Sequence, residues 1–353
     1  MLGCLYLTVG YLCITFLWSD TVSLEQFGHY GKRAVYVICF VTSIAMVYAR
    51  QHRQLDTVLR LFCYAAGVYA VLTLAAYFIS GSVKEVLAAV GFETYGKIDH
   101  NVIPRLRFGG NQMDHPNNAA MVFGLAILVA LRLCFTADSR VRARVIWQLL
   151  IAVFLIVLVL TQSRGPIAAL LLTIPLVICL FRPKAWRTVT ALVTLAAILG
   201  AWSIQSVALE RVFPRGFDLG LRGSIYEECV IDGLQTPVFG RGIEQDTPIF
   251  ARRWGGGINQ DHCHNMLIDI FRFGGLVGVV LMSVLLGSAF VVAWRNGQEA
   301  RFWGAVLFFG LVCVSGDGYY PITKTTVFWL VCWAPIGLLL GVSLKRSREN
   351  AGQ

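Results

Sequence analysis

Long apolar runs, separated by short polar segments, dominate the chain. Runs of about 17 to 25 residues are long enough to cross the hydrocarbon core of a bilayer. Backbone groups inside lipid must be satisfied within their own segment, which favours helices. We predict ten such helices, with the ranges 1–17, 34–49, 58–80, 118–136, 145–162, 166–181, 187–208, 265–294, 302–315 and 326–343. The pattern predicts an all-α polytopic membrane protein.

The composition agrees with this interpretation. Hydrophobic residues make up 57% of the chain and charged residues 14%, far from the balance of a soluble globular protein. The first run has no basic residues ahead of it and no small-residue cleavage site, so we expect a membrane span and not a signal peptide. We expect residues 1–353 to form a single integral membrane domain, with no soluble domain before, between or after the helices.

The distribution of Lys and Arg predicts the orientation, because these residues are enriched in cytoplasmic connections. If the segment LKRSREN near the C-terminus is cytoplasmic and the ten runs alternate, every cytoplasmic connection is short and basic. These connections hold half of the 30 basic residues: Arg50, Arg53, Arg60, Arg132, Arg140, Arg142, Arg144, Arg182, Lys184, Arg187, Arg295, Arg301, Lys345, Arg346 and Arg348. The net charge of +10 therefore mainly records topology, and no motif indicates a nucleic-acid partner.

The opposite face carries the long connections, 18–33, 81–117 and 209–264. Loops of this length in a compact protein are usually functional. Arg164, in TQSRGP, and Asp317, in SGDGYY, lie on the same face. We therefore expect an active site that faces away from the cytoplasm at the depth of the lipid headgroups, with the 209–264 loop carrying part of it.

Two arginines are candidates for binding an anion. Arg164 ends a strongly apolar span, and Pro166 follows in the next one. An arginine at this depth must pair with a partner or reach the headgroups as an interfacial anchor. Arg222 precedes a predicted loop helix in LRGSIYEECVIDGLQTP, for which we predict Ser224 as the N-cap and Glu227 as its capping-box partner. Helix N-termini attract phosphate, and the alternative for Arg222 is an ordinary surface residue.

The predicted apolar side of this loop helix consists of Ile225, Val230 and Leu234.

The stretch NQDHCHNMLIDIFRFGG places His264 where the loop enters the eighth predicted helix. A histidine there can be a general base, a metal ligand or a structural residue. Asp261, His262 and His264 are candidate metal ligands, because residues i and i+2, such as His262 and His264, share a face if the stretch is extended. No further pair with structural-zinc spacing lies nearby. A third ligand would have to come from another loop: His100, Asp114 or His115. We predict no metal.

The same stretch contains a carboxylate and a guanidinium inside its apolar run. Asp269 and Arg272 are three residues apart, a spacing that predicts mutual neutralisation on one helix face. Gly274, Gly275 and Gly278 predict a close approach by a neighbouring helix. Neither feature requires a role in catalysis.

Eight of the ten cysteines lie in predicted spans and are typical of small apolar residues there. The other two, Cys229 and Cys263, lie in the long outer loop. A disulfide between them is an option in an oxidising compartment, and the sequence leaves it open.

Taken in order, several motifs resemble the O-antigen ligase and polymerase superfamily. They are TQSRGP, an arginine ahead of TPVFGRG, HN at the start of the next span, and HPNNAAM over 115–121. The family includes lipopolysaccharide O-antigen ligases, O-antigen polymerases and protein O-oligosaccharyltransferases. The resemblance implies a GT-C-like fold with one large periplasmic loop, here between the seventh and eighth predicted helices. Such ligases have about twelve spans, so two N-terminal helices are missing or the chain is a shorter relative.

The resemblance also implies the roles of individual residues. His264 matches the histidine of the H-N motif and would be the general base. Arg164 and Arg222 match the family's arginines and would bind the donor diphosphate. Four further residues are candidate supporting groups: Asn117, Arg241, His262 and Asn265.

The function implied is that of an O-antigen ligase in the bacterial inner membrane, with its active site facing the periplasm. It would transfer a glycan from undecaprenyl pyrophosphate to the lipid A-core oligosaccharide, with inversion and without metal or other cofactor. A polymerase or a protein O-oligosaccharyltransferase would use the same donor. A membrane transporter is the alternative from another class, although we find no inverted repeat or paired broken helices typical of one.

Overall fold

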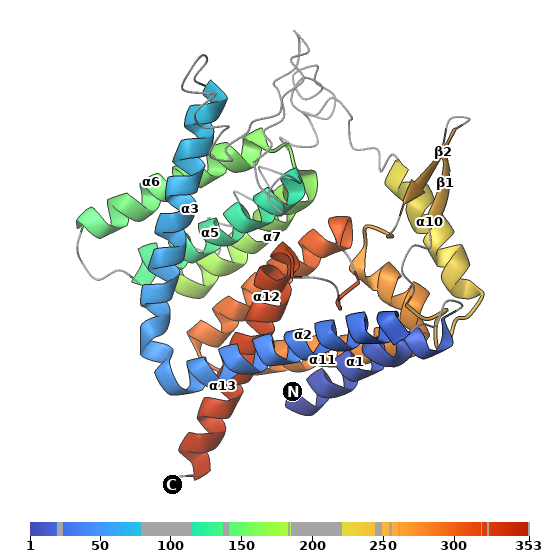
Figure 1. Ribbon diagram of the computed structural model, residues 1–353. Coiled ribbons are helices and arrows are strands. Elements are labelled where there is room, and N and C mark those ends of the chain that lie inside the picture. Colours follow the sequence, from blue (N-terminus) through green and yellow to red (C-terminus); the bar gives the residue numbers. More distant parts are fainter. Residues whose placement is uncertain are drawn as a thin grey trace. The chain divides into compact units, whose positions relative to one another are not determined.

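The computed structural model describes residues 1–19, 24–78, 115–136, 141–182, 184, 221–243, 249–253, 256–260, 262–318, 320–322 and 325–351. These residues are almost entirely helical, which confirms the predicted fold class (Figure 1). The α-helices are α1 (Leu2–Ile14), α2 (Leu24–Gln51), α3 (Leu55–Phe78), α5 (Pro116–Thr136), α6 (Val141–Leu160), α7 (Arg164–Phe181), α10 (Leu221–Leu234), α11 (Met266–Arg295), α12 (Gln298–Asp317) and α13 (Ala334–Ala351).

Shorter elements complete the described part of the chain. Two 3₁₀ turns, Thr15–Trp18 and His52–Gln54, follow α1 and α2, and a π-helical turn, Trp329–Trp333, leads into α13. Two strands, β1 (Ile249–Arg253) and β2 (Gly256–Gln260), form an antiparallel hairpin in which Ile249 is opposite Gln260. This hairpin was not predicted from the sequence.

Among the described residues, eight helices are long and apolar enough to cross a membrane, and Leu2–Trp18 forms a shorter apolar helix. Nine of the ten predicted runs coincide with these helices, and the run 187–208 lies outside the described residues. Three helices are clearly longer than predicted. The second begins at Leu24 instead of residue 34, the ninth extends to the 20 residues of α12, and the last continues to Ala351 instead of ending at residue 343.

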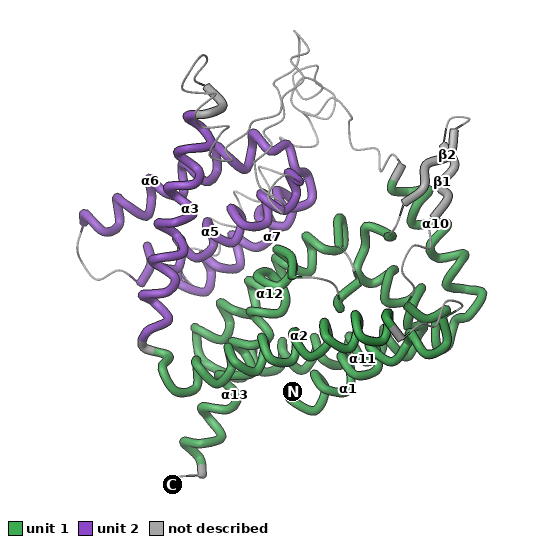
Figure 2. Tube along the Cα trace, in the orientation of Figure 1, with its two compact units in different colours: residues 1–52, 219–353 green, residues 53–218 purple. Residues whose placement is uncertain are grey.

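The chain divides into two compact units, coloured separately in Figure 2. Unit 2 covers residues 53–218 and contains α3, α5, α6 and α7. The helix α5 is its centre, because α3, α6 and α7 all contact it and most of its residues are buried. By contrast α3 exposes Val58, Leu61, Val68 and Val71 along one side, an apolar face typical of contact with lipid.

Unit 1 covers residues 1–52 and 219–353 and contains α1, α2 and α10 to α13. Basic residues gather at one end of its helices. At one end, Arg346 donates to the backbone oxygen of Arg295 over 3.3 Å, and Lys345 Nζ lies 3.2 Å from His52 Nε2. Three segments predicted to share the cytoplasmic side therefore meet. The opposite end of α11, about 45 Å away along a helix of 30 residues, carries His264.

The helix α11 is broken in its first third. Gly275 has φ +61° and ψ −164°, which interrupts the helical ladder. The segment 237–242 pairs with the freed groups: Arg241 and Gly242 donate to the carbonyls of Arg272 and Phe273, and the oxygens of Pro237 and Val238 accept from Leu276 and Val277. The hydroxyl of Tyr11 donates to the oxygen of Gly274 over 2.8 Å. Protein groups thus satisfy backbone that lipid would leave unpaired.

Glycine is required at this crossing. A Cβ on Gly240, whose φ is +72°, would lie 2.4 Å from the carbonyl carbon of Phe273. The three atoms nearest to a Cβ on Gly242, whose φ is +83°, are backbone atoms of Thr15 and Ser19. The glycines of TPVFGRG therefore have a structural explanation, since they let the backbone of this segment form hydrogen bonds with the backbone of α11 on both sides of Gly275. The predicted close approach of a helix is confirmed at Gly274 and Gly278, which α1 contacts.

Candidate active site

Asn265 fixes the start of α11 and joins it to α12. Its side-chain oxygen accepts from the backbone N–H groups of Leu267 and Ile268, which makes it the N-cap. Its amide nitrogen donates to the backbone oxygen of Ser315 over 2.8 Å. The asparagine of the HN pair therefore has a structural role here, that of holding the preceding histidine next to the end of α12.

His264 has a backbone conformation that residues with a side chain rarely adopt. Its φ is +52°, and left-handed backbone at such a residue costs on the order of 1–3 kcal/mol. Its backbone oxygen accepts from the N–H of Gly318 over 3.3 Å. A Cβ at Gly318 would lie 2.2 Å from the oxygen of Val314, so glycine permits this close approach. Strain held in place by surrounding structure is common at active sites.

Asp317 orients the imidazole of His264. Oδ1 of this carboxylate lies 2.7 Å from His264 Nδ1, and only 6% of its side chain is exposed, against 18% for His264. An ionised carboxylate can only accept a hydrogen bond, so Nδ1 of a neutral His264 carries the proton. The lone pair of the ring is then on Nε2. This tautomer is the one that a general base acting through Nε2 needs.

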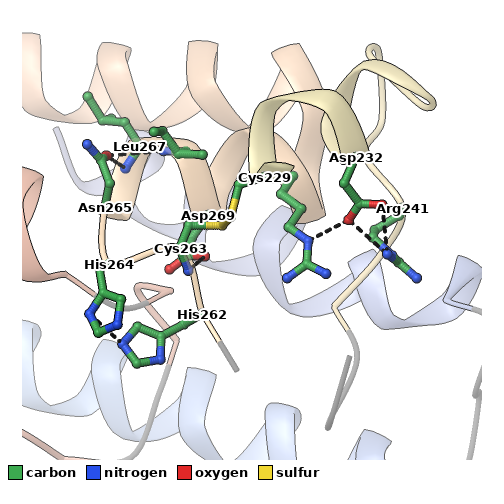
Figure 3. The surroundings of a disulfide bond; sticks show 11 residues. Cys229, Asp232, Arg241, His262, Cys263, His264, Asn265, Leu267 and Asp269 are labelled. Carbon is green, nitrogen blue, oxygen red and sulfur yellow. Dashed lines mark hydrogen bonds and ion pairs between the residues drawn. A yellow bond between two sulfur atoms is a disulfide. The ribbon is translucent and has the colours of Figure 1, made fainter. Parts of the chain in front are cut away.

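His262 lies against the same pair. Its Nε2 is 3.1 Å from His264 Nδ1, and the two ring centroids are 4.0 Å apart (Figure 3). With the proton of His264 on Nδ1, Nε2 of His262 is its second acceptor. The predicted supporting residue is thus in contact with the predicted base.

Arg222 reaches the same carboxylate from α10. Its guanidinium nitrogen NH2 lies 3.4 Å from Asp317 Oδ1, and 37% of its side chain is exposed. One carboxylate oxygen is therefore shared by an imidazole and a guanidinium. Because a guanidinium has five N–H donors in a planar fork, Arg222 can contact Asp317 and present further donors to an anion.

The helix that carries Arg222 differs from the prediction in two respects. It starts at Leu221, so Arg222 is in its first turn, and Ser224 is an interior residue instead of the N-cap. Ile225 is buried as predicted, but Val230 and Leu234 are exposed. The apolar contact face follows Ile225 and Cys229 instead, because residues four apart lie on one side of a helix.

Tyr226 also lies near this group of charges. Burial raises the pKa of its hydroxyl, the charge of Arg222 lowers it, and the charge of Asp317 raises it. The net effect is an increase, so Tyr226 remains a neutral hydroxyl at physiological pH.

A disulfide links α10 to the segment that carries the histidines. Cys229 and Cys263 are bonded and fully buried, packed with Ile225 and Ile268 (Figure 3). The option left open by the sequence is therefore realised. The bond fixes the residue directly before His264 to α10.

Asp232 forms a second link between α10 and its neighbours. Both of its oxygens accept from Arg241 NH1, at 2.9 and 2.8 Å, and Oδ2 accepts from Arg272 Nε at 2.6 Å. Partial burial alone would raise the pKa of Asp232, but the hydrogen bonds and charges of Arg272 and Arg241 outweigh it and hold the pKa below its ordinary value. Arg241, a predicted supporting residue, thus binds Asp232.

The predicted mutual neutralisation of Asp269 and Arg272 takes another form. Arg272 donates to Asp232, which is 40 residues away in sequence. Asp269 is fully buried, and its Oδ1 accepts from the backbone N–H of Cys263 over 3.0 Å. Helical spacing predicted Asp269 as the partner of Arg272. Packing of α11 against α10 instead places the carboxylate of Asp232 within hydrogen-bond distance of the guanidinium.

Three potential metal ligands meet at the site, His262, His264 and Asp317, whose ligand atoms lie within 4.8 Å of one another. Asp261, the third member of the cluster considered from sequence, lies outside the described residues. Two ligands of a tetrahedral zinc ion are roughly 3.4 Å apart when the metal–ligand bonds are about 2.1 Å long. The 2.7 Å between His264 and Asp317 is instead typical of a charge-assisted hydrogen bond.

The remaining predicted residues lie in unit 2. Arg164 is the first residue of α7 and is exposed, directly after buried Ser163. Asn117 is buried in the first turn of α5. The common diphosphate site of Arg164 and Arg222 therefore stays a prediction, as does the role of Asn117.

Comparison with known proteins covers the same residues. Positions 149–283 match a family model described as O-Antigen ligase, and this range includes Arg164, Arg222 and His264. The chain is also similar to the O-antigen ligase of Pseudomonas aeruginosa, at 21% identity over 342 residues, which are 96% of this chain and 76% of the relative.

Both matches make the chain similar to O-antigen ligases. Asp317 lies outside the residues that match the family model. The sequence predicts that it lies on the same face as His264, but no role for it was predicted. The sequence did contain a signal for this contact. Asp317 ends one predicted span and His264 precedes another on the same face, so the two side chains are expected at a similar depth in the membrane. Asp232 was not predicted either, because its two partners, Arg241 and Arg272, come from two other segments of the chain.

Proposed function

We propose that this protein is an O-antigen ligase that transfers a glycan from undecaprenyl pyrophosphate to the lipid A-core oligosaccharide at the periplasmic face of the inner membrane. Its matches to an O-antigen ligase family model and to a bacterial O-antigen ligase support glycosyl transfer. The observation that carries the proposal is the grouping of His264, Asp317 and Arg222, with Asp317 Oδ1 2.7 Å from the imidazole and 3.4 Å from the guanidinium.

The proposed reaction is an inverting displacement at the anomeric carbon of the donor glycan. The acceptor hydroxyl attacks C1 from the face opposite the diphosphate, and a new C1–O bond forms as the bond to the leaving diphosphate breaks. His264 Nε2 takes the proton of the attacking hydroxyl, and undecaprenyl diphosphate leaves with the electron pair. A positioned general base is worth about 10²–10⁴ in rate.

Asp317 and Arg222 have distinct parts in this proposal. Asp317 holds the base in the tautomer with its lone pair on Nε2, and it stabilises the imidazolium formed after proton transfer. Arg222 stabilises the charge that develops on the leaving diphosphate, and Arg164 adds a second positive charge. No metal ion is needed, because the arginines neutralise the phosphate oxygens.

The proposed orientation draws support from the grouping of charged ends in unit 1. Basic helix ends meet at Arg295, Lys345 and Arg346, and this end would be cytoplasmic under the positive-inside rule. The candidate site lies at the opposite ends of α11 and α12. The disulfide beside His264 fits an oxidising compartment such as the periplasm.

The decisive experiment is expression in a Gram-negative strain that lacks its own O-antigen ligase. We expect long-chain glycan on lipopolysaccharide, seen as a ladder on a gel, and no ladder with the His264→Ala variant. Longer glycans that remain on the lipid carrier would indicate a polymerase, and glycan on protein would indicate an O-oligosaccharyltransferase. No transfer to any acceptor, with solute flux in vesicles, would support the transporter alternative and overturn the proposal.

A further inference from the structure

Two separate links fix the helix α10, and both lie on the side of it that also carries Arg222. Cys229 is seven residues, or two turns, after Arg222, and Asp232 is ten residues after it, about 10 and 15 Å along the axis. Gly233 packs against α11 on the same side, since a Cβ there would lie 2.8 Å from the ring of Phe271. The position of Arg222 is thus determined by contacts further along its own helix.

The first link joins α10 to the base. Cys263 directly precedes His264, and its sulfur is bonded to Cys229. Its backbone N–H is held by Asp269 inside the first turn of α11. This covalent bond sets the distance between the helix of Arg222 and the loop of His264.

The second link joins α10 to the break in α11. Asp232 binds Arg272, which is 2% exposed, and Arg241 in the segment that pairs with the break. Removing one partner of such a pair leaves a buried guanidinium without its counter-charge, which is costly. Rotation of α10 about the disulfide alone is therefore opposed by this carboxylate.

We propose that the Cys229–Cys263 disulfide and Asp232 are positioning elements that hold Arg222 at the Asp317–His264 pair. The inference rests on the proposed function, because it assigns these residues to the placement of its diphosphate-binding arginine. Arg222 has 37% of its side chain exposed and a 3.4 Å contact with Asp317, so its own contacts hold it weakly. The two links hold the helix instead, and the guanidinium is aligned before substrate arrives.

The test compares three variants with the unaltered chain: Asp232→Asn, a double Cys229→Ala/Cys263→Ala change, and all three substitutions together. Transfer is measured per folded molecule with purified protein and lipid-linked donor. We expect each link alone to lower kcat with little change in KM, and the combined variant to lose roughly a hundredfold, as for a small misplacement of a catalytic group. Asp232→Glu, which keeps the charge, should recover part of the loss.

Asp56→Asn is the matched control. It breaks another carboxylate–arginine pair, Asp56 with Arg132 at 2.6 Å, in unit 2. We expect it to lower thermal stability without lowering kcat. Alkylation before and after reduction should show one disulfide and eight free thiols.

The outcomes separate this inference from the proposed function. Full kcat in both Asp232→Asn and the double cysteine variant, with an inactive His264→Ala protein, would overturn the positioning role and leave the ligase proposal standing. An active His264→Ala protein would refute the base itself. A loss in Asp232→Asn that Glu does not recover, and that the Asp56→Asn control matches, would show general destabilisation and also overturn the inference.

Discussion

The helices α7 and α10 each carry, in the first turn, an arginine that the sequence predicts to bind diphosphate, yet their surroundings differ. Arg222 on α10 faces Asp317 and the base, and a disulfide and a carboxylate fix its helix. Arg164 on α7 is exposed and follows a tight turn, in which Gln162 has φ +51° and Ser163 is buried. Contacts along α10 fix the helix of Arg222, whereas Arg164 begins its helix directly after a turn with positive φ at Gln162.

This difference indicates different functions for the two charges. An arginine aligned by an oriented carboxylate can bind two phosphate oxygens in a fixed geometry. An arginine at an exposed helix start adds its charge to the partial positive charge of the helix N-terminus. Gln162 and His264 are the non-glycine residues with positive φ in the described part of the chain. Each lies within two residues of a predicted site residue or is one.

The largest effect is expected from removal of the general base, His264. His264→Ala should insert at a normal level and lose transfer by at least roughly a hundredfold, because the hydroxyl proton has no acceptor. Transfer to lipopolysaccharide, normalised to protein in the membrane, is the measurement. Near-normal transfer by this variant would remove His264 from the mechanism and leave the arginines without a common role.

The next effect separates the two arginines directly. Arg→Ala at either position should nearly abolish transfer. Arg222→Lys should recover little, because lysine is a point donor and cannot replace a planar fork. Arg164→Lys should recover a larger fraction, since charge alone suffices there. A fully active Arg222→Ala protein would refute the binding of the diphosphate by both arginines. Equal recovery by Lys at both sites would show that the two arginines act in the same way.

Two glycine substitutions, one in each unit, allow a matched comparison of thermal stability. Gly240→Ala should destabilise unit 1 by about 1–3 kcal/mol, because φ is positive and backbone of α11 occupies the Cβ position. Gly165→Ala, beside Arg164 on α7, should be neutral or slightly stabilising. Among the described residues, no atom outside its chain neighbours and the backbone of its own helix lies within 4 Å of its Cβ position. Thermal unfolding in detergent measures both. A stable Gly240→Ala protein would contradict the pairing of the segment 237–242 with α11.

The smallest effect is expected from metal removal. Excess EDTA should leave transfer unchanged, because the short contact between His264 and Asp317 is typical of a hydrogen bond. The assay uses purified protein with lipid-linked donor. If EDTA abolished activity and zinc or manganese restored it, the cluster of His262, His264 and Asp317 would be a metal site.

Much of the fold could be predicted from sequence because lipid imposes one rule, that apolar runs form helices. The same rule placed Arg222 and His264 on one face. Sequence could not predict that Arg272 would pair with Asp232, 40 residues away, because charge partners across elements depend on packing. Local spacing suggested Asp269 instead, and a capping-box pattern suggested a helix start at Ser224 where the helix had already begun.

The position of the segment 237–242 in the chain bears on how the protein is made. Synthesis proceeds from the N-terminus, so this segment, and Tyr11 of α1, emerge before α11. The groups that pair with the carbonyls of Arg272, Phe273 and Gly274 therefore exist before the break at Gly275 reaches the membrane. The partners of the α11 backbone are therefore synthesised before α11 itself. A chain in which the segment 237–242 followed α11 would present unpaired backbone to lipid during insertion.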